Sequence, residues 1–263
     1  MLATWTDAVF LLMNNALAMS PSDRPSATSA SIATVADVIS RAVFVQPILS
    51  APVDLAKISA NESQVLLGAL FLFIGAAAAA GIAIALYPVL RTHSEGLALG
   101  SVGFRLIEGV LYLGIVVCLL SLVTLSQESA MAGAAASSAY EVAGVPLMAA
   151  RDSLGEVAVL AFGLGALMYY GVFYQSRLVP RWLSAWGLAA IALVMVSGVL
   201  VMLGLTEPMS TTQVVLAFPI FLQEMVLAVW LIAKGFNPSA VAESAGRTST
   251  PRAAASTVSG SAA

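Results

Sequence analysis

Residues 64–90 read QVLLGALFLFIGAAAAAGIAIALYPVL, a long apolar run that contains no charged residue. A helix rises about 1.5 Å per residue, so about 20 such residues cross the roughly 30 Å hydrocarbon core of a bilayer. Four further runs are of similar apolar character, at residues 102–125, 154–174, 182–205 and 213–234. A soluble core of this size needs no such set of runs, so the chain is predicted to cross a membrane several times.

The composition agrees with this interpretation, since 60% of the 263 residues are hydrophobic and only 10% are charged. The runs are too long for the strands of a transmembrane barrel, which need about ten residues of alternating character. Backbone amides in lipid must be satisfied within their own segment, so the runs are predicted to be helices. The fold class that follows is an all-α, polytopic transmembrane helix bundle.

Residues 31–49 form a sixth, degenerate candidate span. The segment is apolar except for Asp37 and Arg41, each of which costs about 2.5–3.5 kcal/mol at the centre of a membrane helix. The two residues are four positions apart on one helical face, where they can pair. We therefore expect six spans, the first of which contacts the other helices rather than lipid.

The two ends of the chain have a different character. Residues 1–30 are predicted to be a disordered or interfacial extension, in which Met1 and Met19 are both candidate start residues. Residues 237–263 are rich in Ala, Ser and Thr and lack an apolar period, so they are predicted to be a disordered tail.

The basic residues between the spans predict the orientation in a cell membrane. With six spans and a cytoplasmic N-terminus, the outer connections contain only Lys57 and Arg151. The inner segments contain seven basic residues: Arg24, Arg91, Arg177, Arg181, Lys234, Arg247 and Arg252. Cytoplasmic segments carry an excess of Lys and Arg, so both termini are predicted to be cytoplasmic. The longest connection is then an outer loop at residues 126–152, with a short interfacial helix at Val145–Ala150.

Several classes of function are disfavoured. The net charge of −3 argues against nucleic acid, which requires a basic face. The single histidine, His93, and the single cysteine, Cys118, cannot build a two-histidine zinc site, a bis-histidine haem site or a cysteine-ligated cluster. No glycine-rich phosphate loop or serine nucleophile elbow is present. We therefore expect no metal, no cofactor and no enzymatic activity. An intramembrane enzyme would depend on buried carboxylates alone.

The strongest candidate for a functional residue is Glu224, which lies with Gln223 near the middle of the last run. Pro219 precedes it and is expected to kink the helix. A carboxylate at that depth must face protein or water, or be protonated, and its default interpretation is functional. We expect Glu224 to be protonated at rest, or to share a polar cluster with Glu108 and Gln223 that water reaches from the cytoplasm. A structural hydrogen bond to a neighbouring helix is the alternative.

Arg105, Glu108 and Tyr112 lie on one face of the run at 102–125 and form a second candidate group. The simplest interpretation is an intrahelical ion pair near the cytoplasmic edge. Side chains lean toward the N-terminus of their own helix, so Arg105 leans toward the cytoplasm and Glu224 leans outward. The two residues are therefore predicted not to pair.

Glu156 is a further candidate, at the outer start of the run at 154–174. Asp152 is a plausible N-cap for this helix, and Glu156 in an early turn complements the helix dipole. Its role is either structural or part of a binding site.

Several stretches resemble a known family. They include GFRLIE at 103–108, SRLVPRWLS at 176–184 and EMVLAVWLI at 224–232, together with 59–69, 86–90, 95–100, 150–152 and 234–238. Over about residues 32–240 the chain resembles a family of bacterial integral-membrane proteins, the domain of unknown function 4386. The family usually has a clean first span, which Asp37 and Arg41 interrupt here. The resemblance implies a fold and a membrane location, but no activity.

Two functional hypotheses remain. In the first, Glu224, Gln223, Glu108 and Arg105 line a polar pocket that binds or transports a small solute, with coupling to protons. In the second, the chain is an assembly or regulatory membrane protein, in which the same charges only hold helices together. The expected partners are the lipid bilayer and a small solute or proton. The sequence indicates no oligomeric state.

Overall fold

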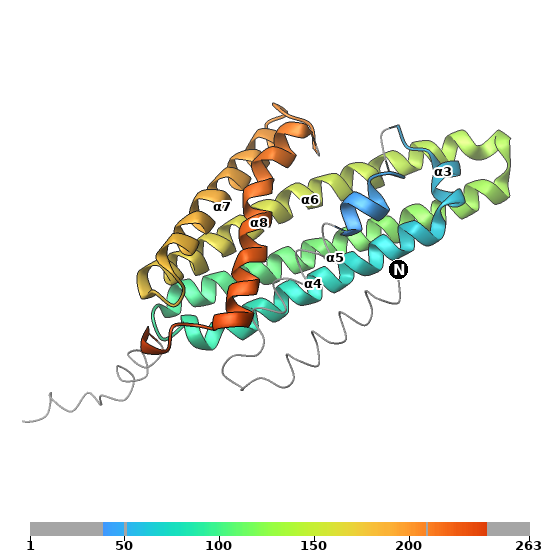
Figure 1. Ribbon diagram of the computed structural model, residues 1–263. Coiled ribbons are helices and arrows are strands. Elements are labelled where there is room, and N and C mark those ends of the chain that lie inside the picture. Colours follow the sequence, from blue (N-terminus) through green and yellow to red (C-terminus); the bar gives the residue numbers. More distant parts are fainter. Residues whose placement is uncertain (1–38, 50–51, 209, 241–263) are drawn as a thin grey trace, which may run out of the picture.

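The structure is a computed structural model that describes residues 39–49, 52–208 and 210–240, and within these ranges every regular element is a helix (Figure 1). The elements are η1 (Ile39–Val45), α3 (Leu55–Ala60), α4 (Glu62–Leu90), α5 (Glu95–Ala132), α6 (Ala134–Ser176), α7 (Arg181–Met202) and α8 (Thr211–Lys234).

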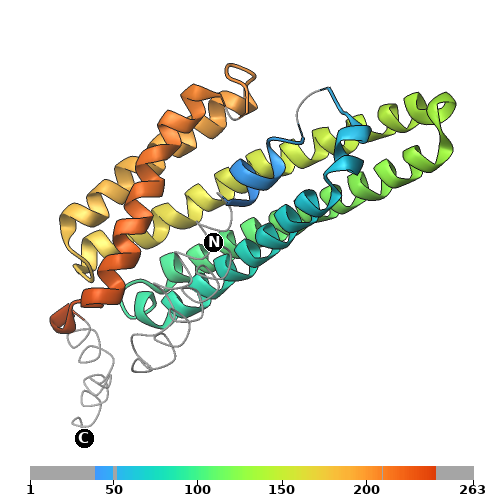
Figure 2. The same cartoon turned by 45° about the vertical axis from the view of Figure 1, so that its right-hand side comes forward.

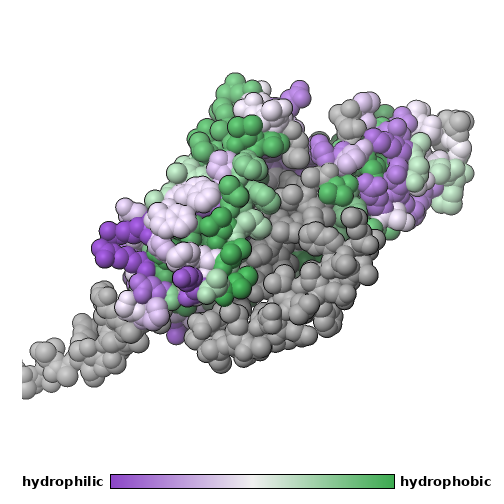
Figure 3. Space-filling view, in the orientation of Figure 1, coloured by the Kyte–Doolittle hydropathy of each residue, from purple (hydrophilic) through white to green (hydrophobic). Residues whose placement is uncertain are grey.

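Five of these helices, α4 to α8, are long and apolar enough to cross a membrane. Each of them contains all or most of one of the five runs predicted from the sequence, which confirms the helix bundle. Their apolar surface is not all buried. Figure 3 shows hydrophobic side chains over much of the α7–α8 region and hydrophilic ones toward the ends of the molecule. Phe218, Val229 and Val196 are among the exposed apolar side chains of these two helices, as expected for surfaces that face lipid.

The prediction of a loop at residues 126–152 is wrong. In the structure α5 continues to Ala132 and α6 begins at Ala134, so that Gly133 alone connects them, with φ of +79°. The stretch is rich in Ala, which favours a helix in water as well as in lipid. The two helices therefore form a hairpin that projects beyond the rest of the bundle (Figures 1 and 2).

The helices pack in chain order, α4 against α5, α5 against α6, α6 against α7 and α7 against α8. Small residues permit close approach of the helices. A Cβ atom on Gly109 of α5 would lie 3.3 Å from the carbonyl oxygen of Ala76 in α4. One on Gly165 of α6 would lie 3.3 Å from Cβ of Phe104 in α5. α8 packs mainly against α7, so its relation to α5 and α6 depends on long side chains.

The predicted first span lies only partly within the described residues. Asp37 and the side chain of Arg41 fall outside them, and the helical part is η1, which packs on α4. The Ser40 hydroxyl donates to the carbonyl oxygen of Gly68 at 2.7 Å, and Gln64 Nε2 donates to that of Val43 at 3.2 Å. The helix η1 therefore lies beside α4, while a complete sixth span stays a prediction.

Candidate functional site

A buried ion cluster surrounds Arg105, which projects from α5. Its Nη1 atom donates to Glu108 Oε2 at 3.0 Å, one helical turn further along α5. Its Nη2 atom donates to the hydroxyl of Tyr169 in α6 at 3.2 Å and lies 3.6 Å from Glu224 Oε1 in α8. The guanidinium also lies 4.6 Å from the ring centroid of Phe162 in α6. One cation thus connects three helices, and its flat face rests on an aromatic ring.

The Arg105–Glu224 ion pair contradicts the prediction that the two residues do not pair. That prediction rested on the opposite lean of the two side chains along antiparallel helices. The stem of an arginine is long and flexible, however, and its head can reach a polar partner away from the direction of its Cα–Cβ bond. Arg105 and Glu224 are 4% and 7% exposed, so the pair is enclosed by protein.

The cluster lies well inside the bundle. Glu224 precedes the last residue of α8, Lys234, by ten positions, which corresponds to about 15 Å of helix. That is about half the thickness of a hydrocarbon core. Glu108 is 3% exposed, so all three charges are withdrawn from water at this depth. Such a group of charges is costly, and each charge must be compensated by a neighbour.

Tyr169 is a member of the cluster that the sequence did not predict. Its hydroxyl accepts from Arg105 and donates to Glu224 Oε1 at 3.3 Å, so it bridges the cation and the carboxylate. The sequence feature that could have indicated it is the pair Tyr169 and Tyr170 within an apolar run, because buried hydroxyls in a membrane require hydrogen-bond partners.

Gln223 belongs to an adjoining hydrogen-bond chain rather than to the ion cluster. The Tyr170 hydroxyl donates to Gln223 Oε1, and Gln223 Nε2 donates to the carbonyl oxygen of Leu183 in α7 at 3.2 Å. The rings of Tyr169 and Tyr170 are 4.4 Å apart between centroids. The two consecutive tyrosines of α6 therefore hold the two consecutive polar residues of α8, Gln223 and Glu224.

A small cavity of about 20 Å³ borders the cluster, with Arg105, Tyr169 and Glu224 in its wall. The rest of the wall is apolar and includes Ile82 and Leu86 of α4. A cavity of this size can hold one water molecule, but it is too small for a solute with several heavy atoms. Arg105 Nε is buried and has no hydrogen-bond partner among the described residues.

Tyr112 and Glu156 lie further along the bundle than Arg105, toward the α5–α6 hairpin. A Cβ atom on Gly100 would meet the side chain of Met168, and one on Gly114 would meet that of Leu154. This antiparallel register of α5 and α6 places Tyr112 at the level of Glu156. Glu156 precedes Tyr169 by 13 positions in α6, or about 20 Å of helix. The structure thus brings Arg105, Glu108 and Glu224 together and places Tyr112 one helical turn beyond Glu108, at the level of Glu156.

Within residues 39–49, 52–208 and 210–240, no three His, Cys, Asp or Glu side chains are placed to hold a metal ion. The cluster instead combines one cation, two carboxylates and a phenol. Such a set can bind and release a proton, and it can break and re-form ion pairs between α5 and α8.

Five apolar helices around a buried ion cluster define a polytopic α-helical membrane protein. The chain belongs to the family described as a domain of unknown function, DUF4386, whose model matches residues 31–235. This confirms the resemblance noted in the sequence. Among curated proteins and among solved structures, none matches the chain.

Proposed function

We propose that this membrane protein moves a small solute and that the movement is coupled to a proton held by Arg105, Glu108 and Glu224. One observation carries the proposal: a single buried guanidinium lies 3.0 Å from one carboxylate and 3.6 Å from another on a different helix. The two carboxylates thus compete for one cation near the middle of the bundle.

The charges of the cluster do not balance unless a proton is bound. Arg105 contributes one positive charge, and Glu108 and Glu224 contribute two negative charges when both are ionised. Among the residues that line the adjoining cavity, Arg105 is the only cation. A net charge is costly in this environment, so the cluster favours a state with one proton shared between the two carboxyl groups.

Proton exchange would then be linked to the position of α8. When Arg105 pairs more closely with Glu108, Glu224 binds the proton. The electrostatic attraction between Arg105 on α5 and Glu224 on α8 then weakens. Because α8 packs mainly against α7, these two helices could move together relative to the other spans. The cavity of about 20 Å³ is too small for a solute, so solute binding requires such a movement.

We further propose that the protein lies in the cell membrane with its C-terminus in the cytoplasm. Four basic residues gather at one end of the bundle, namely Arg91 after α4, Arg177 after α6, Arg181 at the start of α7 and Lys234 at the end of α8. Lys57 and Arg151 lie toward the other end. Such an excess of basic residues is typical of the cytoplasmic side. The role proposed for the cluster is not enzymatic.

An assembly or regulatory role is the second candidate. It is favoured by the close fit of the cluster, which leaves space for only about one water molecule and joins α5, α6 and α8. In that case the charges hold the helices together and exchange no proton. The two candidates differ in the effect of Glu224→Gln, which retains the shape of the side chain and removes its charge.

Purified protein in sealed vesicles with an internal pH-sensitive dye tests the proposal. Amino acids, sugars and small organic cations are added separately under an imposed pH gradient. We expect one solute class to change the internal pH faster than in empty vesicles. Glu224→Gln should abolish this effect at an equal amount of folded protein, whereas Glu207→Gln, the same change on an exposed loop, should retain it. A Glu224→Gln variant that unfolds, or that matches the parent for every solute, would contradict transport.

A further inference from the structure

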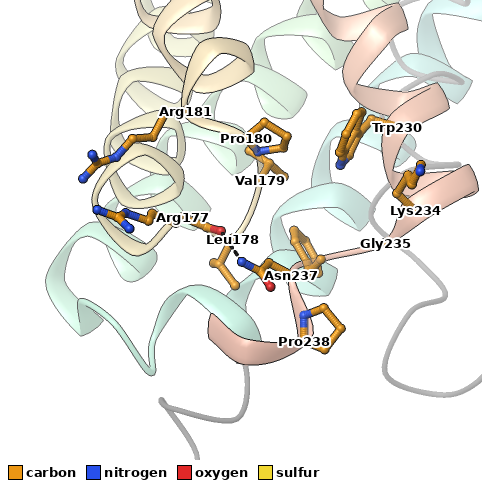
Figure 4. A pocket seen from close by; sticks show the side chains of 11 residues that line it. Arg177, Leu178, Val179, Pro180, Arg181, Trp230, Lys234, Gly235, Asn237 and Pro238 are labelled. Carbon is orange, nitrogen blue, oxygen red and sulfur yellow. Dashed lines mark hydrogen bonds between the residues drawn. The ribbon is translucent and has the colours of Figure 1, made fainter.

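A larger cavity lies at the end of the bundle where α6 passes into α7 and α8 ends. Its volume is about 570 Å³, and it is open to the surface (Figure 4). Its lining includes three basic residues, two aromatic residues and an amide, namely Arg177, Arg181, Lys234, Trp230, Phe236 and Asn237. It is separate from the ion cluster, with which it shares no lining residue.

Hydrogen bonds fix the wall of this cavity. After α8 the chain turns at Gly235, which has φ of +67°, a conformation that glycine adopts without strain. The backbone N–H of Asn237 then donates to the carbonyl oxygen of Leu178 at 2.9 Å, and its side chain donates to that of Arg177 at 3.4 Å. Phe236 packs against Phe173 with 5.9 Å between ring centroids. The end of α8 is therefore attached to the α6–α7 connection.

Three cations border the cavity, and the guanidinium of Arg181 lies 5.6 Å from the ring centroid of Tyr174. Arg177 and Arg181 extend on one side of the Val179–Pro180 segment, and Lys234 lies on the other side (Figure 4). None of these three cations forms an ion pair within the part of the chain that the structure describes. The N-terminus of α7 also lies here, and no side chain caps it. The dipole of this helix adds to the attraction for an anion.

The lining is also apolar and aromatic. Trp230 lines the cavity, and its ring lies 6.4 Å from that of Trp182, which is 54% exposed. Tryptophan is enriched where membrane helices meet the headgroup region, because its ring is apolar and its N–H is polar. A ligand that fits this lining has an anionic group attached to an apolar body.

We propose that this cavity binds the phosphate headgroup of an anionic phospholipid. The cations would hold the phosphate, while Trp230 and Phe236 would contact the glycerol and the start of the acyl chains. The site lies at the ends of three helices that are long and apolar enough to cross a membrane, which is where a bilayer around them would place its headgroups. A free phosphate ion would match the cations but not the apolar wall. The proposal does not depend on the proton cluster.

Quenching of tryptophan fluorescence tests this site. Brominated phosphatidylglycerol or brominated phosphatidylcholine is titrated into the full-length protein in micelles, and Trp230→Phe identifies the signal of Trp230. We expect Trp230 to be quenched at a lower mole fraction of phosphatidylglycerol than of phosphatidylcholine. Arg181→Gln and Lys234→Gln should each reduce this preference about fivefold.

The control is Arg91→Gln, which removes a cation at the same end of the bundle but outside the cavity. It should leave the preference unchanged. An equal loss with Arg91→Gln would show a general surface attraction and overturn the proposal. Equal quenching by the two lipids would overturn it too. Relief of quenching by inorganic phosphate at the lipid concentration would assign the site to a soluble phosphate and contradict a lipid ligand.

Discussion

Arg105 Nη2 lies 3.6 Å from Glu224 Oε1 and so connects α5 with α8 in the interior of the bundle. The same guanidinium donates to Glu108 at 3.0 Å, so a carboxylate of its own helix is available whenever Glu224 withdraws. A cation with two alternative partners can exchange one for the other at a lower cost than a pair that must separate completely. This relationship makes α8 the element whose position can depend on the charge state of the cluster.

Arg105→Gln should lower the free energy of unfolding by about 3–5 kcal/mol, because it leaves Glu108 and Glu224 buried without their shared cation. Glu224→Gln should cost much less, because the ion pair between Arg105 and Glu108 is retained. Thermal unfolding in detergent measures both variants. If Arg105→Gln and Glu224→Gln lowered the free energy of unfolding equally, Arg105 would not be the shared partner of the two carboxylates.

Gly187→Ala should destabilise the contact between α6 and α7. A Cβ atom at Gly187 would lie 2.6 Å from Cε1 of Tyr170, which is fully buried and whose hydroxyl donates to Gln223 Oε1. We expect a cost of about 1–3 kcal/mol, as for other overpacked cores. Gly171→Ala is the matched control, because a Cβ atom there meets no atom within 4 Å. A melting temperature equal to that of the control would show that Tyr170 is free to move.

The proposed orientation predicts the labelling of engineered cysteines in a Cys118→Ser background. Met131, near the tip of the α5–α6 hairpin, is 80% exposed, and Ser239 is exposed just after α8. A membrane-impermeant maleimide should label Met131→Cys in intact cells and Ser239→Cys only after the membrane is opened. The reverse pattern would invert the topology and place the basic end of the bundle outside.

The sequence predicted the five long helices because length and apolar character alone decide which segments can cross a bilayer. The same criterion failed at residues 126–152. Hydropathy marks where the hydrocarbon core ends, and a helix can continue into water when its residues favour helical structure. The single connecting residue, Gly133, carried no stronger signal than the small residues around it.

The members of the cluster were easier to predict than their pairing. Arg105, Glu108 and Glu224 were recognised because ionisable residues are rare within apolar spans. Their contacts depend on helix register and on the reach of long side chains, which one sequence does not specify. Tyr169 was missed for a related reason, since a tyrosine is common in membrane helices and becomes informative only when its hydroxyl has a partner.

Infrared spectroscopy of the carboxyl groups tests the central claim, a single proton shared by Glu108 and Glu224, most directly. Difference spectra of the purified protein are recorded across a pH titration in the C=O stretching region of protonated carboxyl groups. The charge count predicts one buried carboxyl signal in the parent and its loss in both Glu224→Gln and Glu108→Gln, each of which leaves a neutral pair with Arg105. Glu207→Gln should retain the signal. A signal that persists in both cluster variants, or a parent without one, would contradict the account.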